Sequence, residues 1–389
     1  MKTLIISGPI YPKPGNNVTL LKKLFPRLAG TTDLQLLSVL GQTQSSDLPD
    51  SLGKASLRWC LDERHDFRRR IGYPLLAKLK DPKGFSDYLT ARLLLDAAKT
   101  LQKESPFDAV ISTMEPFPAA DAAAKLRGVK KVLYLMDPPA CISKGRRTPY
   151  RDRRLKSILA EQDAILTTPF IRQALGEHGY ERFDPRIISV GFPMIEHHEI
   201  TKRQPDDGQI HLLFCGWLYS DIRSPKYFLD ILSRLDERFT VTFMGRECEK
   251  LTERFDVQTK AKLITLPQQP YEAALQAMAD ADILINIGNS VPVHMPSKTL
   301  EYINTGKPFV NFYKMDDCPT LYYTKRYPLC LNLSEQDTDL EAAAQRFIDF
   351  CVQNKGKTVD RASIETEYAD CTPEYIAQKI IDALGEQHE

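Results

Sequence analysis

The stretch PSKTLEYINTGKPFVNF, residues 296–312, combines a short helix pattern and a buried strand pattern in one motif. Pro296 and Ser297 stand where helices commonly begin, and Gly306 stands where they commonly end. These signals predict a helix over residues 297–305. The apolar run at 308–312 follows at once and predicts a strand, so the motif is one step of an alternation of helices and strands.

The same alternation extends from this motif toward both ends of the chain. Short runs rich in Ile, Leu and Val predict strands, and apolar residues three and four positions apart predict helices. The other predicted strands are 3–7, 34–39, 109–112, 131–135, 164–167, 186–190, 210–215, 239–244, 262–266, 282–287 and 329–333. The other predicted helices include 18–28, 118–127, 225–236, 271–279 and 372–384. Because the strands are continuously apolar, we expect parallel sheets with both faces covered.

A polar segment with two prolines and a glycine, residues 192–209, interrupts the alternation and predicts a linker. The fold class is therefore α/β, with two tandem doubly wound, Rossmann-like parallel-sheet domains that face each other across a cleft. We expect an N-terminal domain at 1–195 and a C-terminal domain at 205–370. The final segment, 372–389, is expected to be a helix that packs back on the N-terminal domain.

Composition excludes several other classes of protein. The chain has 389 residues, 42% hydrophobic and 26% charged, which is typical of a globular protein of two domains and not of a disordered or fibrous one. No apolar run approaches the roughly 18 residues that span a bilayer, so neither a transmembrane helix nor a signal peptide is expected. The eight cysteines are scattered without a CxxC pair. They predict reduced thiols in a cytoplasmic protein rather than disulfides or a zinc site.

Charge is divided unevenly along the chain. Residues 1–200 hold 31 basic and 22 acidic residues, a net charge of +9, whereas the remainder has a net charge of −8. The run KGRRTPYRDRRLK at 144–156 has seven basic residues and one acidic residue. It predicts either a solvated helix face or contact with an anionic membrane or a lipid pyrophosphate. The contact residues would be Arg146, Arg147, Arg153 and Arg154. Nucleic acid is not expected as a partner, since interleaved aromatic residues are lacking.

Loops after predicted strands hold residues suited to a nucleotide, because ligands of parallel sheets bind at the carboxyl ends of strands. The start of the helix at 297–305 offers free N–H groups for a diphosphate, and Glu301 can accept hydrogen bonds from a ribose diol. The turn GWLYSDIRSPK at 216–226 offers Gly216 for close backbone approach and Arg223 with Lys226 as a phosphate clamp. The alternatives are an ordinary capped helix with a solvated Glu301, and ordinary surface cations at Arg223 and Lys226.

The opening loop GPIYPKPGNN, residues 8–17, lacks the GxGxxG fingerprint of dinucleotide-binding proteins, which disfavours a dehydrogenase. Gly15 and Asn16 in this loop are candidates to place backbone amides against a ligand held mainly by the second domain.

Over nearly its whole length the chain resembles the GT-B nucleotide-sugar glycosyltransferases, in particular glycosyltransferase family 4. The family's P-S-K-x-x-E-Y-x-x-x-G-K-P block is matched at positions 296–308. The resemblance implies that Glu301 holds the ribose, with Gly245 and the loop 266–269 near the base. The residues implied at the diphosphate are Ser297, Lys298 and Thr299.

Three positions depart from the family pattern. Val293 stands where the family commonly has a second glutamate that touches the donor sugar. Trp217 replaces an arginine after the loop glycine, so Arg223 and Lys226 must supply the cationic clamp. Asp137 replaces a histidine at the end of an N-domain strand and is carried as a candidate catalytic residue.

The resemblance implies retaining transfer of a hexosyl unit from a nucleotide-sugar, a UDP-sugar by preference, in cell-surface polysaccharide or glycoconjugate synthesis. The acceptor would be a glycan or a polyprenyl-linked molecule at the inner face of the membrane. The departing diphosphate would help to deprotonate the attacking hydroxyl, so no cofactor or metal is expected. The DxD-like stretch at 280–282 is expected to be structural. The alternatives are a catalytically silent nucleotide-binding or scaffold protein of this fold, and a nucleotide-sugar epimerase.

Overall fold

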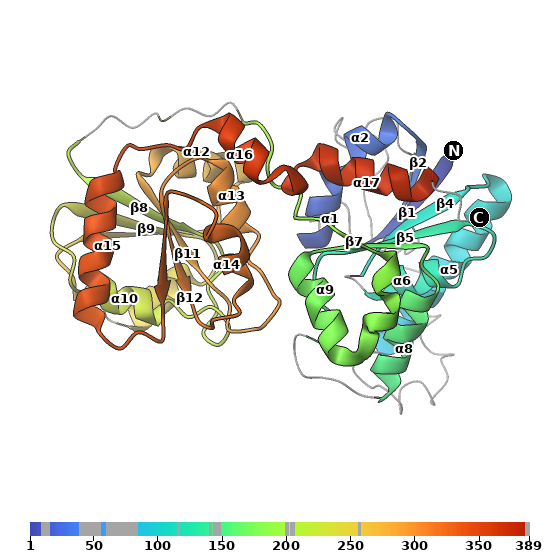
Figure 1. Cartoon of the computed structure of the whole chain (residues 1–389), viewed down its shortest axis with the longest axis horizontal. Coiled ribbons are helices and arrows are strands. Elements are labelled where there is room, and N and C mark those ends of the chain that lie inside the picture. The colour runs from blue at the N-terminus through green and yellow to red at the C-terminus, as the bar shows by residue number, and fades with distance from the viewer. Residues whose placement is uncertain are drawn as a thin grey trace. The chain divides into compact units, whose positions relative to one another are not determined.

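The computed structural model describes residues 1–8, 16–38, 56–59, 85–114, 117–139, 142, 149–198, 202, 207–255 and 258–385. The chain forms two compact units (Figure 1). Unit 1 comprises Met1–Pro193 with Asp370–Glu389, and unit 2 comprises Met194–Ala369. Each unit contains its own parallel sheet covered by helices, which confirms the predicted α/β class.

Unit 1 has a seven-stranded parallel sheet in the order β3-β2-β1-β4-β5-β6-β7. The strands are β1 (Lys2–Ser7), β2 (Asp33–Ser38), β3 (Ser56–Trp59), β4 (Ala109–Thr113), β5 (Lys130–Leu135), β6 (Ala164–Thr167) and β7 (Ile187–Ser189). Six of these strands were predicted and are confirmed within two residues. Strand β3 was not predicted, because its sequence SLRW has no apolar run and it lies at the edge of the sheet.

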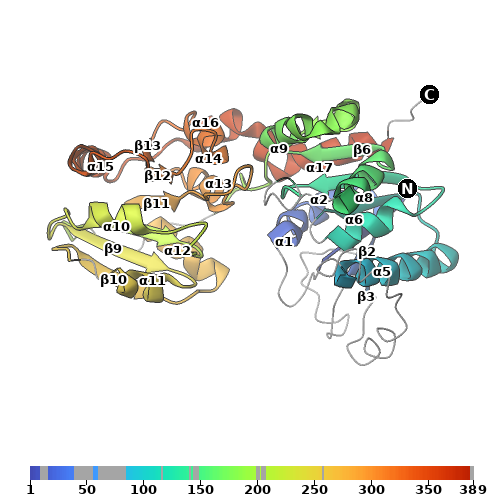
Figure 2. The same cartoon turned by 90° about the horizontal axis from the view of Figure 1, so that it is seen from below.

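The helices of unit 1 cover both faces of this sheet. Among the described residues they are α1 (Asn16–Lys22), α2 (Phe25–Ala29), α5 (Phe85–Glu104), α6 (Phe117–Ala124), α8 (Pro149–Ala160), α9 (Pro169–Leu175) and α17 (Pro373–Gly385). Helix α5 lies alongside α6 (Figure 2), whereas α17 packs on α2 and β5. The single helix predicted at 18–28 is wrong. The chain breaks between α1 and α2, because Pro26 lacks an N–H and fits only the first turn of a new helix.

Unit 2 has a six-stranded parallel sheet in the order β10-β9-β8-β11-β12-β13. All six strands were predicted and lie within one residue of their expected bounds: β8 (Ile210–Cys215), β9 (Phe239–Met244), β10 (Lys262–Leu266), β11 (Ile283–Ile287), β12 (Phe309–Tyr313) and β13 (Cys330–Ser334). The helices are α10 (Lys226–Leu232), α11 (Cys248–Arg254), α12 (Tyr271–Asp280), α13 (Lys298–Asn304), α14 (Pro319–Thr324), α15 (Leu340–Asn354) and α16 (Arg361–Glu367).

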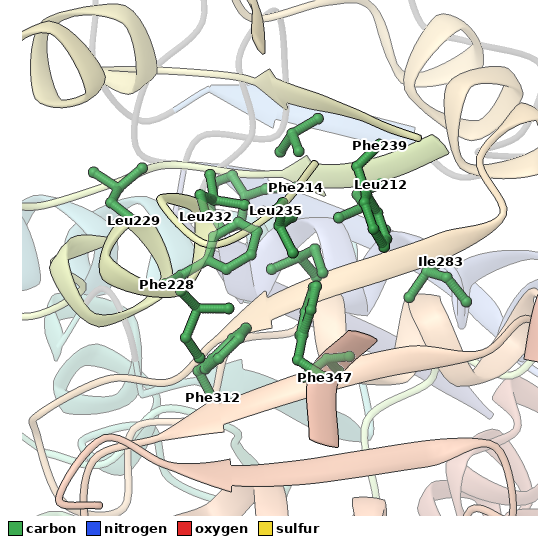
Figure 3. Packing of buried hydrophobic residues seen from close by; sticks show 14 of the residues in the cluster. Leu212, Phe214, Phe228, Leu229, Leu232, Leu235, Phe239, Ile283, Phe312 and Phe347 are labelled. Carbon is green, nitrogen blue, oxygen red and sulfur yellow. The ribbon is translucent and has the colours of Figure 1, made fainter. Parts of the chain in front are cut away.

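Aromatic side chains bind the helices of unit 2 to its sheet. The ring of Phe228 on α10 lies 5.1 Å from that of Phe312 on β12, and Phe312 lies 6.1 Å from Phe347 on α15 (Figure 3). Such ring pairs add about 0.5–1.5 kcal/mol each to the free energy gained from apolar burial. The carboxyl ends of the strands are therefore fixed on a rigid base.

A ladder of buried amides crosses three strands of the same sheet. Asn286 on β11 donates to Asn311 on β12 at 2.7 Å, and Asn311 donates to Asn332 on β13 at 2.8 Å. Buried amides are stabilising only when their partners are in place, so the ladder favours one register of these strands.

Candidate functional site

The carboxyl ends of β8, β9 and β10 approach one another at two glycines. The amide of Gly216 donates to Met244 at 2.9 Å, and that of Gly245 donates to Leu266 at 3.0 Å. Gly245 has a φ of 140°, and a Cβ there would lie 1.7 Å from the Gly216 carbonyl oxygen. Only glycine fits position 245. At Gly216 an added Cβ would make only ordinary van der Waals contacts, with the Phe214 ring at 3.4 Å and the Arg223 guanidinium at 3.9 Å.

Arg223 lies in the loop between β8 and α10 and is half-buried. Its Nε donates to Asn289 Oδ1 at 2.9 Å, and its Nη1 donates to the Trp217 carbonyl oxygen at 3.2 Å. Burial lowers the pKa of the Arg223 guanidinium. Among the described residues no carboxylate pairs with it. A desolvated cation with only neutral partners is typical of a site whose negative charge arrives with a ligand.

Lys226, the other half of the expected clamp, is placed differently. It is exposed at the start of α10 and forms an ion pair with Asp230 at 2.8 Å. Lys314, which the sequence analysis missed, instead supports the Arg223 loop, because its Nζ donates to the Ser224 carbonyl oxygen at 3.3 Å. Lys314 also forms an ion pair with Glu335, and both side chains are largely buried. Burial raises the pKa of Glu335, although Lys314 acts in the opposite direction.

Helix α13 is fixed to the end of β8 through Tyr302. The Tyr302 hydroxyl donates to the Cys215 carbonyl oxygen at 3.2 Å and accepts from the Cys215 amide at 3.0 Å. Burial raises the pKa of Tyr302, with a further increase from Glu301 and a decrease from Arg223. Residues Arg223 and Glu301, predicted from separate motifs, therefore lie around the same tyrosine.

Glu301 is not the solvated surface residue of the alternative interpretation. Its side chain is 11% exposed and forms an ion pair with Lys298, which is 22% exposed. Burial lowers the pKa of Lys298, but the Glu301 carboxylate outweighs burial and the net shift is upward. Burial, and then Glu301, also raise the pKa of Tyr271 at the start of α12 to about 12.

The first turn of α13 offers fewer free amides than expected. The amides of Thr299, Leu300 and Glu301 donate to the carbonyl oxygens of Pro296 and Ser297. The Ser297 side chain forms no cap, and the buried Thr299 hydroxyl has no partner within the described part of the chain. Any backbone N–H contact of this turn with a phosphate therefore depends on the amides of Ser297 and Lys298.

An exposed aromatic stack, also missed by the sequence analysis, borders the site. The Trp217 ring is 40% exposed and stacks on Tyr219 with 4.7 Å between ring centroids. The Arg246 guanidinium lies 4.8 Å from the Trp217 ring, and its Nε donates to Gln268. Gln268 belongs to the loop that the resemblance places near the base.

The candidate residues of unit 1 have different environments. Asp137 follows β5 and is half-buried. Burial, then Asp137, raise the pKa of Tyr134. Arg153 is exposed on α8, but Arg154 is not available to a membrane, since it forms an ion pair with buried Asp121 at 2.8 Å.

Other candidates lie partly or wholly outside the described residues. Gly15, Arg146 and Arg147 are outside them, and Asn16 is the first residue of α1. Within the DxD-like stretch, Asp282 is buried and is held by Lys202 at 2.7 Å and by the His211 amide at 3.0 Å. These contacts connect Asp282 to Lys202 and to strand β8. No helix of the described residues is long and apolar enough to cross a membrane.

No family model and no curated protein sequence matches the chain. Solved structures do match it over nearly its whole length. The lipopolysaccharide outer core galactosyltransferase WaaB is 12% identical, with a TM-score of 0.63, over 98% of this chain and 99% of its own. HepE of Anabaena, in complex with UDP and glucose, is 13% identical with a TM-score of 0.66 over 100% of both chains.

The chain has the GT-B fold. A glycosyltransferase from Rickettsia africae also matches, with 14% identity and a TM-score of 0.65 over 99% of this chain and 100% of its own. At these identities the matches establish the GT-B architecture, which confirms the fold implied by the resemblance.

Proposed function

We propose that this GT-B protein is a glycosyltransferase that moves a hexosyl unit from a UDP-sugar to a glycan or lipid-linked acceptor, with retention of configuration. One observation carries the proposal: among the described residues the partly desolvated Arg223 guanidinium has only neutral partners, and both Arg223 and the largely buried Glu301 carboxylate act on Tyr302. A nucleoside diphosphate supplies both missing groups, a double negative charge for Arg223 and a ribose diol for Glu301. The solved complex of HepE with UDP-glucose, on the same fold, supports this choice of donor.

The proposed roles follow from the chemistry of each group. Arg223 neutralises charge on the diphosphate as the bond to the sugar breaks, which is the largest electrostatic demand of the reaction. Glu301 accepts hydrogen bonds from the ribose hydroxyls, and Lys298 forms an ion pair with it in its largely buried position. Gly245 and the loop that contains Gln268 would lie along the base, with the Trp217 ring beside them.

Retention would follow if the departing diphosphate accepts the proton of the attacking hydroxyl on the face that it leaves, so that no protein nucleophile is needed. In this mechanism the positive charge of Arg223 is enough to stabilise the departing diphosphate. The mechanism therefore predicts activity without a divalent ion. The acceptor side of the proposal rests on Asp137 and on the basic run of unit 1, from which Arg154 is now removed.

The test is incubation of the protein with UDP-hexoses and candidate acceptors, with release of UDP and the anomeric configuration of the product measured by NMR. The proposal predicts UDP release that depends on acceptor, is insensitive to EDTA and gives a product with the donor's configuration. An inverted product would refute retention.

A second candidate function is favoured by one observation. Val293 offers no carboxylate where the family's second glutamate would stand. A silent binding protein would bind UDP but would form no product with any donor. An epimerase would convert the UDP-sugar without acceptor, and the same NMR experiment would detect this.

A further inference from the structure

Asn289 determines the environment of Arg223. It follows β11, is 3% exposed, and its Oδ1 accepts the hydrogen bond from Arg223 Nε at 2.9 Å. Its Nδ2 donates to the His294 carbonyl oxygen at 2.9 Å and to His294 Nδ1 at 2.8 Å. Because a carbonyl oxygen only accepts, the amide nitrogen must face His294 and the amide oxygen must face Arg223. The orientation of the Asn289 side chain is therefore fixed.

The loop that presents His294 is strained. The His294 amide donates to Val291 at 3.4 Å and closes a turn with Pro292 in the second position and Val293 in the third. Val293 has a φ of 65°, as the third position of a type II turn requires. Glycine or asparagine is usual there, and a β-branched residue at positive φ is rare. Such strain persists only where surrounding contacts impose it, and it is most frequent at functional sites.

Contacts on the other side fix this loop to the loop of Arg223. The Ser290 amide donates to the Ile222 carbonyl oxygen at 2.8 Å, and its hydroxyl donates to the Asp221 carbonyl oxygen at 3.1 Å. Asn289 and Arg223 are thus held together by the main chain on one side and by the His294 turn on the other.

The partner of Arg223 differs from those of the two buried lysines nearby. Lys298 is paired with Glu301, and Lys314 is paired with Glu335. Arg223 faces an amide, although aspartate has almost the same shape as asparagine and would form a charge-assisted bond with the guanidinium. If Arg223 had only a structural role, aspartate at position 289 would stabilise the fold more than asparagine does.

We propose that Asn289, fixed by His294, is a positioning residue that aims Arg223 and leaves its charge uncompensated, so that a ligand's diphosphate supplies the first full negative charge it meets. The inference rests on the proposed function and extends it to residues outside the expected clamp. It predicts that a negative charge at position 289 reduces the part of the binding free energy that comes from the ligand's phosphates.

The experiment compares uridine, UMP, UDP and inorganic pyrophosphate as ligands of the parent, of Asn289→Asp and of Asn289→Ser, by titration calorimetry and thermal unfolding. Asn289→Asp should lower UDP affinity about 10- to 100-fold, the scale of losing a hydrogen bond to a charged group. Uridine affinity should change by less than about twofold, and the melting temperature should stay the same or rise. Gln353→Glu, the same amide-to-acid change at an exposed position on α15, is the matched control.

Asn289→Ser provides a second variant if the aspartate variant does not fold. It removes the acceptor without adding charge, so it should also lower the affinity ratio of UDP to uridine, by less than Asn289→Asp does. A parent-like ratio in the folded variants would overturn the inference while leaving the proposed function intact. A parent that binds pyrophosphate but not UDP would overturn the nucleotide function. The inference about Asn289 would then require that Asn289→Asp lower the affinity for pyrophosphate. A parent that binds neither ligand overturns both.

Discussion

Replacing Glu301 with glutamine separates its ion pair with Lys298 from its proposed role of holding a ribose. Removing one partner of a fully buried ion pair costs about 3–5 kcal/mol. The Lys298 side chain is 22% exposed, so solvent reduces this cost, and we expect Glu301→Gln to lower the free energy of unfolding by about 1–3 kcal/mol. For a domain of this size that lowers the melting temperature by about 2–4 °C per kcal/mol.

The ribose role is measured by the ratio of affinities for UDP and 2′-deoxy-UDP. A hydrogen bond to a charged group contributes about 1.5–3 kcal/mol, so the parent should prefer UDP about 10- to 100-fold. Glu301→Gln should reduce this preference to a few-fold, because the acceptor is then neutral. Calorimetric titration of both ligands gives the ratio directly.

Two controls separate binding from stability. The double variant Lys298→Met with Glu301→Gln removes both charges, so it should recover much of the lost stability and still lack the preference for UDP. Asp230→Asn breaks the exposed pair with Lys226 and should change neither quantity appreciably. If Glu301→Gln melts lower but keeps the parent's preference, Glu301 is only the structural partner of Lys298 and the ribose assignment is wrong.

Three further predictions concern other residues. Arg223→Lys keeps the charge but loses the planar fork, so UDP release should slow at least about tenfold with little change in melting temperature; an unchanged rate would contradict the leaving-group role. Val293→Gly should raise the free energy of unfolding by about 1 kcal/mol, measured by denaturant titration, because it removes strain at positive φ; a lower stability would show that the valine side chain contributes more than its backbone strain costs. Arg154→Met should lower the melting temperature, because buried Asp121 then has one cation fewer, whereas Arg153→Ser should leave the melting temperature unchanged and weaken salt-sensitive sedimentation with anionic liposomes. Equal melting temperatures of the two variants would refute the internal role of Arg154.

The apolar pattern predicted nearly every strand, because most strands of both sheets are buried and a buried parallel strand is visible as a continuous apolar run. The exception, β3, is an edge strand of four residues whose sequence has no such run. The single helix predicted at 18–28 is wrong because the prediction followed the spacing of the leucines and gave too little weight to Pro26. A proline inside a helix pattern commonly marks a break.

The candidate site was predictable where a motif is local and not where it depends on neighbouring strands. Glu301 and Arg223 each belong to one continuous segment, whereas Asn289 joins the site because β11 lies beside β8 in the sheet. The ion-pair partners of Lys226 and Arg154 differ in the same way, one being local in the sequence and the other not. The Lys226–Asp230 pair is four residues apart on a helix and visible in the sequence, but Arg154 pairs with Asp121 across two helices.

The loop at Val293 bears on the choice between an enzyme and a silent binding protein. If this loop had no ligand to position, mutation would relieve a strained β-branched residue at no cost, because glycine or asparagine adopts the same backbone conformation without penalty. Valine nevertheless occupies this position, and within the described part of the chain the turn brings His294 to Asn289, which accepts from Arg223. The strain is therefore connected to Arg223, the proposed leaving-group cation, rather than to the proposed sugar site, where Val293 offers no carboxylate. Valine at position 293 predicts a sugar contact different from one made by a glutamate, while the strained loop supports the proposed diphosphate contact through Asn289 and Arg223.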